Sequence, residues 1–189
     1  MFSGNSDPIQ KRNMLLLMLV LLCLLTGCGD NLFPSGEDQR PPVQTGTTGP
    51  SVGQQAPDFS ARDITGATVT LSSALAGKKG LVLYFTMWCP ICDIHMNHLR
   101  SVVMPSFPDV AFLLVDYVSG SVTDAANAAT SAGYAGSGFT VLADVGQVLL
   151  GSYQGTMGTT VVIDGTGIIT MNEDYQDGSR LRTALTALP

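Results

Sequence analysis

The sequence predicts one α/β domain over residues 52–189, with a central mixed β-sheet flanked by helices and a β-hairpin at its N-terminal end. Short apolar runs alternate with segments of helical character, which is typical of a sheet whose central strands are parallel. Thr65-Gly66 and Asp164-Gly165 are turn sequences between pairs of short runs, and each predicts a hairpin. At roughly 138 residues, the stretch is long enough for one hydrophobic core.

The strands are predicted from apolar runs that are bounded by turn residues. Residues 110–118 are apolar except for Asp116, which is the pattern of a central strand buried on both faces. Residues 81–85 form a similar, shorter run, in which Tyr84 is expected to be a core or rim residue. In chain order, the strands are expected at residues 58–62, 68–71, 81–85, 110–118, 139–142, 159–163 and 167–171.

The helices are predicted from capping residues and stop signals. Pro90 suits the first turn of a helix, and Pro105 is expected to end that helix. Ser121 and Thr123 are candidate N-caps of an Ala-rich helix, with Asp124 in its first turn. In chain order, the helices are expected at residues 72–76, 90 to about 104, 121–133, 145–153 and 178–188.

Residues 1–27 have the pattern of a secretory signal. Lys11 and Arg12 precede an uncharged apolar run of 13 residues, which is too short to span a bilayer. Residues 25–28, Leu-Thr-Gly-Cys, resemble the bacterial lipobox, which implies cleavage before Cys28 and lipidation of its sulfur. An ordinary secretory signal and an uncleaved short anchor are the alternatives, and all three export the domain. Residues 28–51 are rich in Pro, Gly, Thr and Ser, and are expected to form a flexible tether.

Charge and cysteine usage narrow the function further. Removal of residues 1–27 leaves 7 basic and 14 acidic side chains, a net charge of −7. An acidic surface without basic clusters argues against nucleic acid and against electrostatic binding to anionic lipid, so membrane attachment is left to the lipid on Cys28. Cys23 leaves with the signal, so Cys89 and Cys92 are the remaining free cysteines. One pair fits a redox site and does not fit a scaffold of several disulfides.

The segment Trp88-Cys89-Pro90-Ile91-Cys92 carries the strongest functional signal. The preceding strand delivers Cys89 to the cap of a helix, whose N-terminal amides favour negative charge. Because the thiolate is the nucleophile in disulfide chemistry, Cys89 is expected to attack, and the more buried Cys92 to resolve the mixed disulfide. Trp88 is expected to cover one side of the pair. A structural disulfide and half of a zinc site are the alternatives, but such a zinc site normally has a second ligand pair, and the sequence has none.

Two histidines, His95 and His98, follow the cysteines on the same predicted helix. His95 lies one turn beyond Cys92 on the same face. It can tune the thiols or shuttle a proton, hold Cu(I) or Zn(II) together with the cysteines, or be a surface histidine. Asp116, at the end of its strand, is either a proton acceptor for Cys92 or a strand-end cap.

Motifs on both sides of the cysteine pair carry a family resemblance. They are Gln55-Ala56-Pro57-Asp58-Phe59, Asp63-Ile64-Thr65-Gly66 and residues 77–85 before the pair, and Leu142-Ala143-Asp144, Tyr153 and residues 159–169 after it. With them, residues 52–189 resemble the redoxin/TlpA-like branch of the thioredoxin superfamily. The resemblance implies a thioredoxin fold and a thiol–disulfide oxidoreductase without a cofactor, held by its lipid on the extracytoplasmic side of the bacterial cell envelope. Implied partners are thiols and disulfides of exported proteins, including apocytochromes c, and a membrane electron donor.

Two departures from the family pattern concern residues expected to shape the site. Members carry a cis-proline before the last strands, where this sequence has Met157-Gly158; the matching residue is Gly158, or Met157 if the register shifts by one. Because a cis bond before a non-proline residue costs about 2.5–4 kcal/mol, this loop is expected to be trans. His95 stands where many members have an acid, and a cationic histidine there is expected to favour the thiolate.

Two other functions are compatible with the sequence. A peroxiredoxin-like thiol peroxidase would use Cys89, because Thr86 lies three residues before it as in that family, although the proline expected seven residues before is Val82. A copper or zinc carrier would use Cys89, Cys92 and His95. The sequence favours the oxidoreductase, for which we expect no resident metal.

Overall fold

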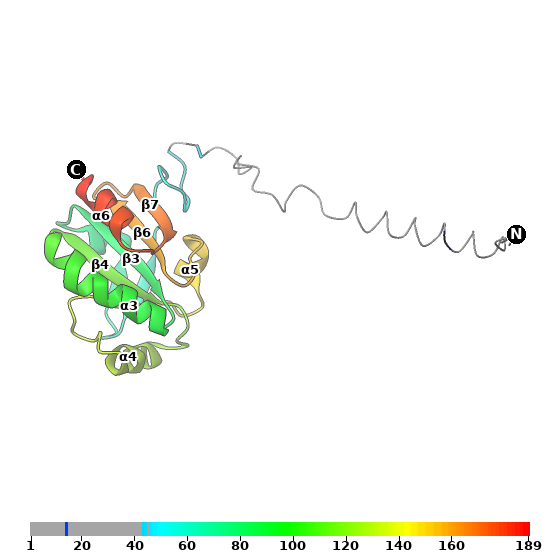
Figure 1. Cartoon of the computed structure of the whole chain (residues 1–189), viewed down its shortest axis with the longest axis vertical. Coiled ribbons are helices and arrows are strands. Elements are labelled where there is room, and N and C mark those ends of the chain that lie inside the picture. Colours follow the sequence, from blue (N-terminus) through cyan, green and yellow to red (C-terminus); the bar gives the residue numbers. More distant parts are fainter. Residues whose placement is uncertain (1–13, 15–42, 45) are drawn as a thin grey trace, which may run out of the picture. The chain divides into compact units, whose positions relative to one another are not determined.

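The structure is a computed structural model that describes Met14, residues 43–44 and residues 46–189 (Figure 1). The rest of the predicted signal, and the predicted lipidation site Cys28, lie outside the described residues. Within the described part of the chain, no helix combines the length and the apolar character that crossing a bilayer requires. Residues 47–50, which the sequence places in the tether, contact the domain: the Asn172 side chain donates to the Pro50 carbonyl at 2.8 Å.

Seven strands form one sheet. They are β1 Ser60–Asp63, β2 Thr68–Thr70, β3 Gly80–Thr86, β4 Val110–Asp116, β5 Thr140–Ala143, β6 Thr159–Asp164 and β7 Ile169–Asp174. Their order is β2-β1-β5-β4-β3-β6-β7, in which β3, β4 and β5 run parallel and the other neighbours are antiparallel. The predicted mixed sheet, with parallel central strands and an N-terminal hairpin, is confirmed.

Helices are joined to the strands in the predicted order. They are α2 Leu71–Leu75, α3 Pro90–His98, α4 Val122–Ser131, α5 Val148–Ser152 and α6 Ser179–Thr186. The Ser121 hydroxyl accepts the Asp124 N–H at 3.1 Å, so the predicted cap of α4 is confirmed.

Two helices differ from the prediction. The segment after α3 continues as a π-helical turn, Leu99–Val103, and a 3-10 turn, Met104–Ser106, which contains Pro105 in its first positions. α5 begins three residues later than expected because Gly146 and Gln147 are left-handed, with φ of 83° and 58°, and cannot belong to a right-handed helix.

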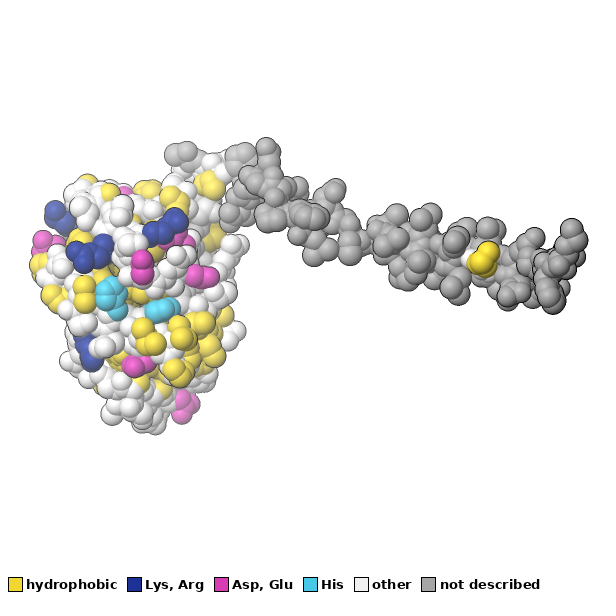
Figure 2. All heavy atoms as spheres, in the orientation of Figure 1, with side chains coloured by type: hydrophobic (Ala, Val, Ile, Leu, Met, Phe, Trp, Pro, Cys, Tyr) yellow, Lys and Arg dark blue, Asp and Glu magenta, His cyan; other side chains and the backbone are white. Residues whose placement is uncertain are grey.

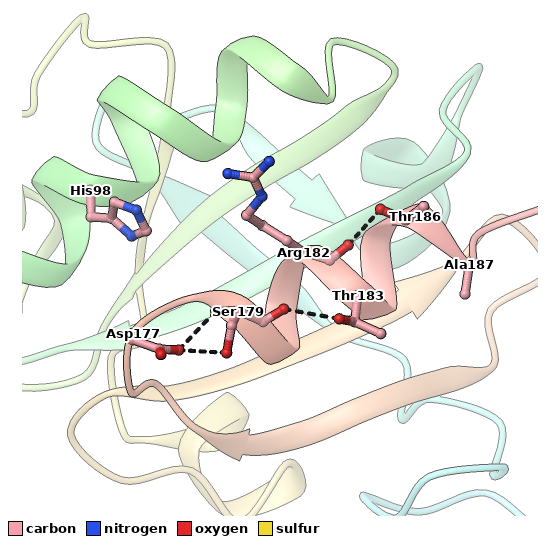
Figure 3. Close-up of a pocket in the computed structure, with 7 residues that line it drawn as sticks. All are labelled: His98, Asp177, Ser179, Arg182, Thr183, Thr186 and Ala187. Atoms are coloured by element: carbon pink, nitrogen blue, oxygen red, sulfur yellow. Dashed lines mark hydrogen bonds between the residues drawn. The ribbon is translucent and has the colours of Figure 1, made fainter.

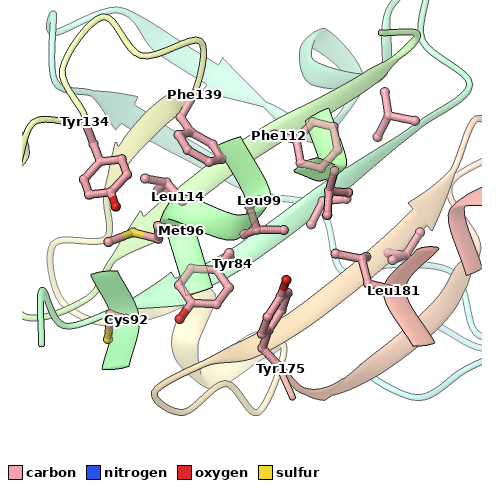
Figure 4. Close-up of a cluster of buried hydrophobic side chains, with 14 of the residues drawn as sticks. Tyr84, Cys92, Met96, Leu99, Phe112, Leu114, Tyr134, Phe139, Tyr175 and Leu181 are labelled. Atoms are coloured by element: carbon pink, nitrogen blue, oxygen red, sulfur yellow. The ribbon is translucent and has the colours of Figure 1, made fainter. Parts of the chain in front are cut away.

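Alternate residues of β3 point to opposite faces of the sheet and divide the core in two. Val82 and Tyr84 face one cluster, to which α3 and α6 contribute (Figures 1 and 4). Leu81, Leu83 and Phe85 face the other, which includes side chains of α2 and α5. Every residue of β3 is buried, which explains its continuous apolar run. Tyr84 therefore points to the side of the sheet that α3 covers.

The candidate site residues lie at the C-terminal ends of the central parallel strands. β3 and β4 are paired from Gly80 opposite Val110 to Thr86 opposite Asp116, so both strands end at the same side of the domain. The Gly158 N–H, just before β6, donates to the Phe85 carbonyl of β3 at 3.0 Å. The start of α3, Asp116 and the loop at Gly158 thus lie together at the C-terminal end of β3 and β4.

Candidate active site

Cys89 is the N-cap of α3, with an extended backbone (φ −82°, ψ 164°). Its sulfur accepts the Cys92 N–H at 3.2 Å, the bond that a Ser or Asp oxygen makes in other helices. Pro90 follows in the first turn, where the missing N–H has no partner to lose. Cys89 is half-buried, Cys92 is fully buried, and their free sulfur atoms lie 2.7 Å apart. A partner can therefore reach Cys89, with Cys92 directly behind it.

The environment of Cys92 favours its ionised form. Burial raises the pKa of this thiol, but hydrogen bonds with the Cys89 side chain, with the backbone amides of Met87 and Cys89 and with the Thr86 hydroxyl outweigh burial, and the pKa lies below its ordinary value. At a sulfur separation of 2.7 Å, the loss of the first proton is a property of the pair. These donors therefore stabilise a negative charge on the pair at the start of α3.

Trp88 is held in an uncommon backbone conformation next to the cysteines. Its φ of 59° lies in the left-handed region, which bulky residues rarely adopt. The Trp88 N–H donates to the Thr86 hydroxyl at 3.1 Å, and the indole Nε1–H donates to Asp116 Oδ2 at 2.8 Å. The other oxygen of this buried carboxylate accepts the N–H groups of Val118 and Ser119 at 3.1 and 3.0 Å. Asp116 therefore caps its strand and fixes the indole at the same time.

His95 is bonded to a buried tyrosine on the strand beneath it. The Tyr84 hydroxyl lies 2.9 Å from His95 Nδ1. Burial, and then the positive charge of His98, lower the pKa of His95, so the ring is mainly neutral at neutral pH. The lowered pKa weighs against a cationic His95 that favours the thiolate, and the half-buried ring is instead placed as a hydrogen-bonding partner of Tyr84.

Gly158 occupies the position that the sequence matched to the cis-proline. The described residues contain no cis peptide bond, so the expected trans loop is confirmed. Gly158 has φ of 85°, and a Cβ atom built there would lie 3.7 Å from His95 Nδ1. Its carbonyl accepts the Tyr175 N–H at 2.8 Å. Gly158 is buried, and a side chain there would contact the His95 ring; Met157, its neighbour, is exposed.

His98 lies one turn beyond His95, at an open pocket of about 650 Å³ (Figure 3). Its Nδ1 is hydrogen-bonded to the Tyr175 hydroxyl. Asp177 and Arg182 line the same pocket, whose lining includes neither cysteine. Figure 2 shows both histidines on one face of the domain, with hydrophobic side chains gathered beside them. Three exposed apolar side chains lie at the cysteine pair in the sequence: Met87 before it, Ile91 between the cysteines and Ile94 after it.

The geometry also bears on the two alternative functions. Thr86 is buried and its hydroxyl accepts the Trp88 N–H, while its second contact is with Cys92 instead of Cys89. Among the residues described here, no group of three His, Cys, Asp or Glu side chains is placed to hold a metal ion. The hypothesis of a Cys89, Cys92 and His95 metal site therefore has no preformed site in this part of the chain.

Sequence reasoning missed the contacts of two tyrosines. Tyr84 was expected as a core or rim residue, yet its hydroxyl bonds to His95. Tyr175, which no pattern singled out, lies with its ring 4.6 Å from the His95 ring. Two signals were available. A buried tyrosine hydroxyl needs a hydrogen-bonding partner, and the alternation of side chains along the strand places Tyr84 on the sheet face that is covered by the helix carrying the cysteines.

Known proteins share this architecture. The chain is 30% identical over 101 residues to the thioredoxin-like protein YneN of Bacillus subtilis (strain 168), a match that covers 53% of this chain and 55% of YneN. It thus spans about half the length of that relative. The structure of MTB dsbF in its mixed oxidized and reduced forms is similar at a TM-score of 0.58 and 26% identity, covering 69% of this chain and 95% of that one.

A secreted Mycobacterium tuberculosis disulfide oxidoreductase homologous to E. coli DsbE has the same fold, with a TM-score of 0.54 and 24% identity over 69% of this chain and 96% of that one. The expected thioredoxin-like fold is therefore confirmed. The family model described as AhpC/TSA matches residues 52–172, which include the cysteine pair, both predicted hairpins and the Gly158 loop. The chain belongs to the AhpC/TSA family, with a thioredoxin-like domain.

Proposed function

We propose that this protein is a thiol–disulfide oxidoreductase that exchanges disulfides with exported proteins through Cys89 and Cys92. The observation that carries the proposal is the half-buried Cys89 sulfur at the N-cap of α3, with the buried Cys92 sulfur 2.7 Å behind it. Such a pair presents one reachable sulfur to a partner and keeps the second in place to complete the exchange. The likeness to MTB dsbF supports the same chemistry.

In the reducing direction, the Cys89 thiolate attacks one sulfur of a partner disulfide. A Cys89–partner disulfide forms, and the other partner sulfur leaves as a thiolate and takes up a proton. Cys92 then loses its proton and attacks Cys89, so the Cys89–Cys92 disulfide forms and the second partner thiol is released. Two electrons pass from the pair to the partner, and a membrane electron donor must return them. In the oxidising direction every step is reversed.

Replacement of Cys92 by serine is expected to stop the exchange at the mixed disulfide. Cys89 keeps its thiol and can still attack, but no second thiol is present to release the partner. The purified Cys92→Ser domain, mixed with an extract of exported proteins, is expected to form covalent complexes that run at higher mass in non-reducing gels and disappear on reduction. The double variant Cys89→Ser/Cys92→Ser is the control. Complexes of equal amount with the double variant would contradict the proposal.

We also propose that Cys28 carries the lipid that holds the domain at the extracytoplasmic side of the membrane. The support is the lipobox-like Leu-Thr-Gly-Cys at residues 25–28 and the tether that follows. In bacterial cells given a clickable fatty acid, the full chain is expected to be labelled and to sediment with membranes. Cys28→Ser is expected to lose the label and to remain as unprocessed precursor, whereas Cys23→Ser keeps it. Labelling of Cys28→Ser at the level of the wild type would exclude lipidation at this residue.

A thiol peroxidase is the second candidate, favoured by membership of the AhpC/TSA family. Stopped-flow oxidation of the reduced domain by hydrogen peroxide separates the two functions. Oxidation of Cys89 at the rate of a free cysteine supports the oxidoreductase, and oxidation by orders of magnitude faster supports the peroxidase.

A further inference from the structure

A buried phenol, that of Tyr84, lies between the buried cysteine and the histidine on the same helix (Figure 4). Tyr84 projects from β3 under α3, and Figure 4 shows its ring between Cys92 and Tyr175, with the hydroxyl directed to the same side as the Cys92 sulfur. The hydroxyl lies 2.9 Å from His95 Nδ1. The pKa of Tyr84 is raised, first by burial, and then by the charges of Cys92 and Cys89 and by a hydrogen bond with the Cys92 side chain. The phenol therefore keeps its proton and stands between the thiol and the imidazole.

The buried carboxylates at this end of the sheet already accept hydrogen bonds from other groups. Two buried acids lie at the C-terminal ends of the parallel strands, Asp116 and Asp144, and both oxygens of each already accept hydrogen bonds. The described residues thus offer Cys92 a tyrosine and a histidine, and no free carboxylate, for the proton that it must lose. His95 suits this role because it is neutral at neutral pH and only half-buried, next to the side-chain-free Gly158.

We propose that Tyr84 and His95 form a proton relay that takes the proton from Cys92 when the mixed disulfide is resolved. The inference rests on the proposed thiol–disulfide exchange and assigns the proton path of its second step. The Cys92 S–H gives its proton to the Tyr84 oxygen while the Tyr84 O–H gives its own to His95 Nδ1. The products are the Cys92 thiolate, an unchanged phenol and the His95 imidazolium. Cys92 then attacks Cys89, the Cys89–partner bond breaks, and the departing partner thiolate receives the proton from His95 or from water.

Other ionisable groups face this relay. Cys89 lies next to Cys92, the Tyr175 ring stacks at 4.6 Å on His95, and His98 lowers the pKa of His95 from one turn away. Burial and the charge of Asp177 raise the pKa of Tyr175 to about 12, so that phenol stays neutral in the relevant pH range. Tyr175 therefore neither takes up nor releases a proton near neutral pH, which leaves Cys92 and His95 as the groups of the relay whose pKa values lie below their ordinary values.

Two successive releases of a coloured thiolate test the relay. The reduced domain (residues 43–189, the compact unit that contains both cysteines) reacts with an aromatic disulfide, Ellman's reagent. Attack by Cys89 releases the first thionitrobenzoate, and resolution by Cys92 releases the second; Cys92→Ser is expected to give the first release only. The rate of the second release is then followed in stopped flow from acid to alkaline pH, with unfolding curves for every variant.

Tyr84→Phe keeps the ring and removes the hydroxyl, and His95→Asn keeps a hydrogen-bond acceptor that cannot take up a proton. Both are expected to slow the second release by about tenfold to a hundredfold at neutral pH, as the loss of a general base does, with a smaller effect on the first release. The difference from the wild type is expected to vanish at alkaline pH, where hydroxide ionises the thiol. Tyr153→Phe is the matched control, because it removes a buried phenol, bonded to the Pro57 carbonyl, on the opposite face of the sheet.

A second release as fast as in the wild type at every pH, in both folded variants, would overturn the relay. So would a rate lowered by the same factor at every pH, because that pattern indicates a misplaced Cys92 and not a missing proton path. The proposed function fails separately: a relay with the expected pH profile in a protein that traps no partner disulfide would leave the relay in place and exclude exchange with proteins.

Discussion

Replacement of Cys89 by serine is expected to reduce disulfide exchange with a protein substrate to the uncatalysed rate, a loss of about a thousandfold or more. A serine hydroxyl does not ionise near neutral pH, so the reachable nucleophile of the pair is lost. Serine is also a favourable N-cap, and its oxygen can accept the Cys92 N–H that the sulfur accepts now. The fold is therefore expected to survive, and the loss to be chemical. Reduction of insulin, followed by turbidity with a small dithiol as the electron source, measures it.

Thermal unfolding of the same sample is the check that Cys89→Ser is folded. Cys92→Ser is the informative companion, because it keeps the reachable thiol and is expected to form the mixed disulfide without turnover. If the folded Cys89→Ser domain still reduced insulin at the rate of the wild type, the assignment of Cys89 as the attacking residue would be wrong.

Replacement of Asp116 by alanine is expected to lower the free energy of unfolding by about 3–5 kcal/mol. The buried carboxylate accepts three hydrogen bonds, from the Trp88 indole and from the N–H groups of Val118 and Ser119. Alanine leaves all three donors without their acceptor at the ends of two central strands. Urea unfolding, with the midpoint and slope compared with the wild type, measures the loss.

Two further variants show how much of the lost stability comes from the hydrogen bonds of Asp116. Asp116→Asn keeps one carbonyl oxygen for the two backbone N–H groups and turns an NH₂ group toward the indole, so an intermediate loss is expected. Asp124→Ala removes an exposed aspartate in the first turn of α4 and is expected to cost about 1 kcal/mol or less. Equal stability of Asp116→Ala and Asp124→Ala would show that the bonds of Asp116 contribute little.

Those features that are encoded locally could be predicted from the sequence. Continuous apolar runs located the parallel strands because both faces of β3 and β4 are buried. Pro90 after Cys89 located the helix start, and with it the orientation of the Cys89 sulfur toward the amides. The left-handed Gln147, which shortens α5, could not be predicted in this way, because glutamine is not a residue type that signals a left-handed backbone.

Contacts between distant segments were also beyond sequence reasoning. Periodicity shows that Tyr84 is buried, but the packing of α3 on the sheet decides that its hydroxyl meets His95. Likewise, the position of Asp116 at a strand end was clear, whereas its bond with Trp88 depends on the register of β3 and β4. The charge of His95 followed from burial and from His98, neither of which a residue pattern measures.

The bond between Trp88 and Asp116 gives the protein a built-in optical reporter. Trp88 is the sole tryptophan of the chain, so its emission has one source. The indole is held in place by Asp116 and adjoins Cys89 in the sequence, so its quenching is expected to change when the pair passes from thiols to disulfide. A redox titration can therefore be followed on the unlabelled protein, and its midpoint gives the reduction potential that decides whether the pair donates or withdraws electrons.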